Sequence, residues 1–192
     1  MSIYEQIGNL GLTFNDGEDS KSGLDEEAYF IPLSWLKTIA KTKPSNTVES
    51  LTEITESHVM IAGKKPIPLT PLFKKSGFKG AYEGEELTKM IKQGPAEFFI
   101  PSLTAATIGT MAAIKNYRGI ILMKRAGASD FMQIGTQGLP AYAVSGEFDT
   151  GTGPTGAVGV KVTFEAYGTV PFYMYKGEVP SDKAPSSAPK GN

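Results

Sequence analysis

Three glycines in the C-terminal half, Gly151, Gly153 and Gly156, have the G-x-G-x-x-G spacing of a dinucleotide-binding turn. Such a turn binds pyrophosphate where it follows a strand and opens a helix, because the helix N-terminus presents free N–H groups. Residues 157–167 instead alternate apolar and polar with a period of two, which is typical of a strand. Pro154 also removes an N–H that a phosphate would need. We therefore interpret the loop as the tip of a β-hairpin and expect no cofactor.

Residues for acid–base, nucleophilic or metal chemistry are few. His58 is the single histidine, and its place in a polar alternation favours a strand histidine that a neighbouring group satisfies. The chain has no cysteine, so a thiolate metal site and a disulfide framework are excluded. Adjacent acids at 25–27 and 85–86 point apart, and the acidic stretch 15–19 lacks the spacing of a calcium loop. We predict no catalytic residue and no metal site.

The elements around the glycine loop are expected to be mostly strands. One helix is predicted over 103–116, since Ser102 offers an N-cap oxygen and apolar residues recur on one helical face. One or two helical turns are predicted over 85–93. Alternating and β-branched residues predict strands at 28–33, 47–62 (one strand, or two separated by a bend), 97–100, 118–124, 131–134, 142–149, 157–167 and 171–175.

The two strands that flank the glycine loop are long and two-faced. At about 3.3 Å per residue, residues 157–167 span roughly 36 Å, which requires a large sheet. Their alternation gives that sheet one apolar and one hydrophilic face. The expected fold is mainly β: an antiparallel β-sandwich or barrel-like core with one flanking α-helix, long loops and an extended N-terminal arm.

The charged residues are distributed unevenly along the chain. The 192 residues carry 19 basic and 20 acidic side chains, a balance that argues against general binding of nucleic acid through its phosphates. Acids gather in the expected arm, 1–27, and lysines in a long loop, 63–84, where three prolines are expected to prevent strand pairing. We expect contacts between neighbouring copies through these two segments; the alternative is two solvated surface runs. The residues concerned are Asp16, Glu18, Asp19, Lys64, Lys65, Lys74 and Lys75.

The remaining organisation is simple. Residues 1–177 are expected to form a single domain, and 178–192, rich in Pro and Ser, a flexible tail. The N-terminal residues lack the pattern of a secretory signal, and no window is long and apolar enough to span a bilayer. We expect a soluble protein of the cytoplasm, or one released from it by lysis, without a membrane partner.

The order of these parts resembles the major tail tube protein of long-tailed bacteriophages, a family similar in fold to the tubes of contractile injection systems. The resemblance lies within residues 94–177. It is carried by Phe98-Phe-Ile-Pro101, Ile114-Lys-Asn116, Ile134-Gly135, Gly146-Glu-Phe-Asp-Thr-Gly151, Val160-Lys-Val-Thr-Phe-Glu-Ala166 and Pro171-Phe-Tyr-Met-Tyr175.

The resemblance implies a structural, non-catalytic subunit. Six copies would form a ring whose inner sheets join into one barrel, and rings would stack into a tube that conducts DNA without binding it specifically. Its partners would be other copies and other tail proteins, and its place the virion tail, assembled in the host cytoplasm. Two alternatives stay open: another structural virion component, such as a terminator or baseplate tube protein, and a monomeric β-sandwich binding module.

If the chain is a tube subunit, the hydrophilic face of the two long strands is a candidate lumen wall. That face would carry three acids and one base, so it would weakly repel DNA and favour transit. The alternatives are that the opposite face lines the lumen or that the set faces solvent. The candidate lumen residues are Ser145, Glu147, Asp149, Lys161, Thr163 and Glu165.

Overall fold

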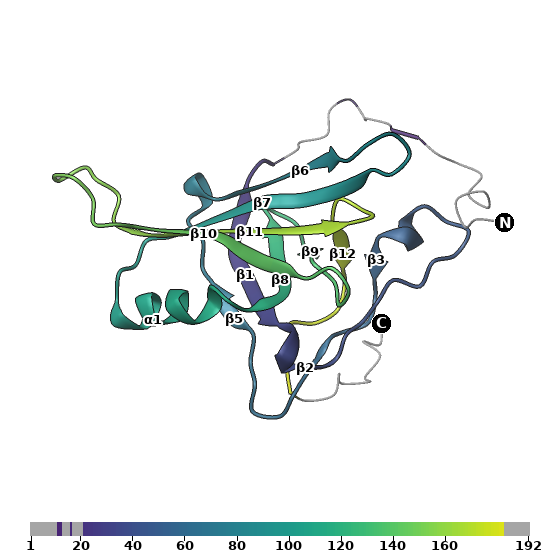
Figure 1. Cartoon of the computed structure of the whole chain (residues 1–192), viewed down its shortest axis with the longest axis horizontal. Coiled ribbons are helices and arrows are strands. Elements are labelled where there is room, and N and C mark those ends of the chain that lie inside the picture. Colours follow the sequence, from purple (N-terminus) through teal and green to yellow (C-terminus); the bar gives the residue numbers. More distant parts are fainter. Residues whose placement is uncertain (1–10, 13–15, 17–20, 183–192) are drawn as a thin grey trace.

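The computed structural model describes residues 11–12, 16 and 21–182, and it is mainly β (Figure 1). A ten-stranded sheet has the order β3-β12-β9-β8-β10-β11-β7-β6, with β1 paired to β8 and β5 paired to β1; β2 and β4 form a second, two-stranded sheet. This sandwich-like arrangement with one flanking α-helix confirms the expected fold class. The strands are β1 (Leu24–Pro32), β2 (Leu36–Thr38), β3 (Glu53–Ile54), β4 (Val59–Met60), β5 (Ile67–Leu69), β6 (Gly77–Glu83), β7 (Met90–Ile100), β8 (Arg118–Arg125), β9 (Phe131–Ile134), β10 (Ala141–Asp149), β11 (Gly159–Gly168) and β12 (Tyr173–Tyr175).

The predicted hairpin around the glycine loop is the pair β10 and β11. The two strands run antiparallel with Glu147 opposite Lys161, and the loop between them extends beyond the sheet (Figure 1). The period-two pattern of β11 has its expected result, since Val162 and Phe164 are buried on one face. On its other side β11 pairs antiparallel with β7, and β7 with β6.

Two buried clusters lie on opposite sides of β1 and β8. The first packs β1 and β8 against the layer of β10, β11 and β7, and in it the rings of Phe30 and Phe164 stack with centroids 5.1 Å apart. The second includes Ile31, Ile120 and Leu122 and faces the other way. Because β8 is buried on both faces, its sequence is a continuous apolar run and not an alternating one.

The helix α1 (Ala105–Ile114) is shorter than expected and begins at a different cap. The N–H of Thr107 donates to the Thr104 hydroxyl oxygen at 3.2 Å, so Thr104 and not Ser102 is the N-cap residue. Ser102 instead exchanges a hydroxyl hydrogen bond with Thr107. The helix buries only Met111 and Ile114.

Residues 63–93 differ from the prediction. Proline does not prevent pairing there, because Pro68 lies opposite Tyr29 in the short strand β5, and an edge strand tolerates a missing N–H. The strand β6 also falls within the expected loop, and β7 begins at Met90. The helical turns expected over 85–93 are therefore wrong; a turn in which Leu87 has φ 63° joins β6 to β7.

The expected arm and tail are both shorter at their inner ends. Residues 24–27 belong to β1. Residues 178–182 lie along β4, where the Met60 N–H donates to the Ser181 carbonyl at 2.8 Å and the Gly63 N–H to the Asp182 carboxylate at 3.3 Å. Residues 183–192, the rest of the predicted tail, lie outside the described residues.

Candidate functional site

The most distinctive surface is the polar face of the four strands β10, β11, β7 and β6, which we call the open sheet. Cross-strand ion pairs connect its charges: Lys161 to Glu97 at 3.2 Å, and Lys92 to Glu165 at 3.0 Å. Glu83 lies 3.9 Å from Lys92 and accepts a hydrogen bond from the Tyr167 hydroxyl at 3.1 Å. The Lys92–Glu165 contact raises the pKa of Lys92, and the Glu83 contact raises that of Tyr167.

The six predicted lumen residues share this face. Ser145 lies opposite Thr163 and Glu147 opposite Lys161, and a β-bulge at Ala143–Ser145 keeps the polar set together. Ser145, Glu147 and Asp149 are exposed, and Lys161 and Glu165 are half-buried. Thr163 is only 7% exposed, because β10 and β7 pair with β11 on either side of it. Its side chain therefore offers little surface to this face.

Sequence reasoning missed the half of this face that β6 and β7 supply. Residues 97–100 of β7 were predicted as a strand, but 90–93 were taken for helical turns and β6 for part of a loop, because β7 lacks the regular alternation of β11. The complete face has five acids, against three lysines on the strands and Lys75 beside them. The set is Glu83, Glu97, Glu147, Asp149, Glu165, Lys79, Lys92 and Lys161.

Within the described chain, both lateral edges of the open sheet are free over most of their length. Beyond a two-residue pairing of Ala141 and Tyr142 with β8, residues 143–149 of β10 pair with no other strand of the described chain on that side. At the far edge, β6 pairs with β7 alone within the described residues. Free N–H and C=O groups on such edges are templates for another strand.

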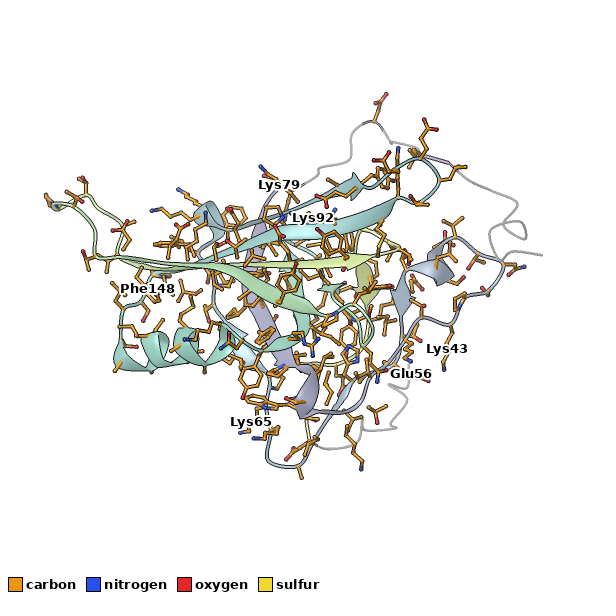
Figure 2. All side chains as sticks on the ribbon, viewed as in Figure 1. Lys43, Glu56, Lys65, Lys79, Lys92 and Phe148 are labelled. Atoms are coloured by element: carbon orange, nitrogen blue, oxygen red, sulfur yellow. The ribbon has the colours of Figure 1, made fainter. Side chains whose placement is uncertain are left out.

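An apolar groove lies beneath the β10 edge, on the side away from the charges. It has a volume of about 380 Å³ and lies between α1 and β10, with Ile108, Met111, Val144 and Phe148 among its walls. Phe148 is 57% exposed, and Ile108 and Val144 are exposed as well. Figure 2 shows Lys79 and Lys92 on the opposite side of the sheet from α1. Exposed apolar groups gathered in this way mark interaction sites.

The predicted contact lysines do not form one patch, because β5 and its neighbours separate them. Lys64 and Lys65 follow β4, where the Lys64 ammonium lies 5.0 Å from the Trp35 ring centroid. Lys74 and Lys75 lie in the 3₁₀ turn η4 (Phe73–Lys75) next to the open sheet, where Lys75 lies 4.8 Å from the Phe99 ring. Of their predicted partners, Asp16 is exposed, whereas Glu18 and Asp19 lie outside the described residues.

His58 is a buried structural residue, as its polar surroundings indicated. The Ala40 N–H donates to His58 Nδ1 at 3.0 Å, so Nε2 carries the proton and donates to the Gln133 amide oxygen at 2.8 Å. The ring stacks on Tyr175. Burial lowers the pKa of His58, which favours the neutral imidazole. It lies in a loop between β3 and β4 and not in a strand.

Several further features of the described chain bear on the class of site. No group of three or more potential metal-ligating His, Cys, Asp or Glu side chains occurs among residues 11–12, 16 and 21–182. Within the same residues, α1 is too short to cross a membrane. Comparisons with protein families, with curated proteins and with solved structures return no match.

Proposed function

We propose that this chain is a structural subunit of a bacteriophage tail tube. Copies assemble into hexameric rings, and the rings stack into a hollow conduit for DNA. The observation that carries the proposal is the open sheet: four strands with two free edges, charges on one face and the core on the other. A sheet of this kind leaves two edges unsatisfied in a monomer, and closing it with further copies removes both.

The strand directions support a ring. All three pairings within the open sheet are antiparallel, so the last strand, β6, runs opposite to the first, β10. Rotation about an axis along the sheet leaves strand directions unchanged. The β6 edge of one copy therefore meets the β10 edge of the next in antiparallel orientation. This contact uses two different surfaces, which is the kind that generates closed rings.

The dimensions support a conduit. Six copies of four strands give a barrel whose backbone walls lie about 45 Å apart, from a strand spacing of about 4.8 Å and a tilt of about 35°. Barrels of 16–18 strands already enclose an aqueous channel. With the charged face inward, the wall is mildly acidic and repels the DNA backbone, which favours passage over binding.

The hairpin tip supports stacking. The loop between β10 and β11 extends past the sheet roughly along the strands, so in a ring it points toward the neighbouring ring (Figure 1). Contacts that repeat along an axis produce a tube. In this proposal the assembled tube associates with further tail proteins. It is built in the host cytoplasm and becomes part of the virion tail.

Negative-stain electron microscopy of the purified chain tests the proposal. Rings and hollow tubes are the expected result. A monodisperse particle of 20.5 kDa at high concentration contradicts it and favours a monomeric binding module. Single rings that never stack would instead favour a terminator or baseplate component.

A further inference from the structure

The two free edges of the open sheet match each other in length. The β6 edge comprises the seven residues Gly77–Glu83, and the free part of β10 runs over 143–149. Their centres are Gly80 and Gly146, and both of these glycines lie on the core face: Gly80 is paired with the buried Gln93, and a Cβ on Gly146 would meet Met111. Two edges of equal length with matching faces can pair along their whole length.

The two edges are also offset along the strand direction, and the size of this offset sets the strand tilt of the closed barrel. Gly80 of β6 pairs with Gln93 of β7, which in turn pairs with Ala166 of β11. Gly146 of β10 pairs with Val162 of β11. The offset is four residues, or about 13 Å, across four strand spacings of about 19 Å in total. Full pairing of the edges therefore tilts the strands by about 35°, within the usual range for closed barrels.

We propose that β6 of one copy pairs with β10 of the next copy in the register that places Gly80 opposite Gly146. This inference rests on the proposed ring and specifies its contact. On the polar face the register places Lys79 opposite Glu147 of the neighbour and Ala81 opposite Ser145. On the core face it places Phe78 opposite Phe148 and Tyr82 opposite Val144.

The charges of the polar face favour this register. Lys92, Lys161, Glu97 and Glu165 already have ion-pair partners in one copy. Lys79 and Glu147 are exposed and have no ion-pair partner within the described chain. Opposite charges directly across an antiparallel pair stabilise it and select the register.

The apolar side chains favour it as well. Tyr82 is 75% exposed at the β6 edge, and Phe78 beside it is half-buried against Phe172. In this register both rings lie on the side of the sheet that holds the groove beneath β10, next to Val144 and Phe148. The groove of one copy is thus filled by the β6 edge of another, and exposed aromatic surface becomes buried on both sides of the contact.

Disulfide cross-linking tests the register, because the chain has no cysteine of its own. Ala81→Cys combined with Ser145→Cys places two thiols opposite each other between copies. Within one copy these positions are separated by three strand spacings, about 14 Å, which is too far for a disulfide. Mild oxidation of the assembled double variant should give a ladder of covalent oligomers on a non-reducing gel. The matched control, Ala81→Cys with Asp149→Cys, is four residues out of register and should stay monomeric.

The possible results distinguish a wrong register from a wrong proposed function. Tubes with cross-links in the Ala81→Cys/Ser145→Cys variant alone support the inference. Tubes whose cross-links instead appear with Ala81→Cys/Glu147→Cys, or with no pair, overturn the register and leave the tube intact. Absence of any assembly by the unmodified chain overturns the proposed function itself. As a second readout, Lys79→Glu should raise the free-subunit concentration at assembly about two- to fivefold, and adding Glu147→Lys should restore it.

Discussion

Phe148 offers the sharpest test of whether the groove beneath β10 is an assembly surface. Full burial of a phenylalanine side chain contributes about 1.5–3 kcal/mol. Because Phe148 is 57% exposed in one copy, roughly half of that contribution, about 0.8–1.5 kcal/mol, is left to be gained when a neighbouring β6 covers it. Phe148→Ser should therefore weaken each contact between copies and leave the fold of the single copy nearly unchanged.

The expected effect is about a four- to twelvefold rise in the free-subunit concentration that coexists with assemblies. Sedimentation velocity across a concentration series measures that quantity directly. Ile61→Ser is the matched control, since Ile61 is 41% exposed but follows β4, far from both sheet edges. The groove is not an assembly surface if Phe148→Ser assembles at the same concentration as the unmodified chain, or if Ile61→Ser impairs assembly as strongly as Phe148→Ser does.

Three further predictions concern the core, the buried histidine and the lumen. Phe164→Ala, at a fully buried ring, should lower the free energy of unfolding by about 3–5 kcal/mol in urea denaturation, whereas a cost below about 1 kcal/mol would contradict the described packing. Because burial lowers the pKa of His58, the unfolded chain takes up a proton more readily; stability should fall as pH drops below about 6.5, and His58→Gln should flatten that dependence relative to the parent. Asp149→Lys in an assembled particle should slow DNA release relative to Asp149→Asn, and equal release by the two variants would count against an inward polar face.

The β10–β11 hairpin could be predicted because its cause is local. Period-two alternation around a loop rich in Gly and Pro favours a hairpin wherever the chain is placed. The same local pattern placed five of the six predicted lumen residues on exposed or half-exposed positions of one face. Thr163 differs because its burial depends on strands on both sides of it, and these cannot be identified from its own strand.

The open sheet could not be predicted in full because its second half depends on distant pairing. Residues 85–93 contain good helix formers, yet the strand β7 extends into them from Met90 because β11 and β6 pair with it on either side. Taken alone, Pro68 predicts the end of a strand, but it lies in an edge strand, where the missing N–H has little effect on stability. The lysines of the expected loop lie at two separate places because β5 and its neighbours lie between them.

A cryo-electron microscopy reconstruction of the purified chain, at a resolution that separates strands, would show the proposed ring and its β6–β10 contact directly. We predict six copies around a channel, with β6 of each copy hydrogen-bonded to β10 of the next and with Glu147 and Lys161 facing the lumen. An assembly in which both edges remain free, or in which the charged face points outward, would contradict this prediction.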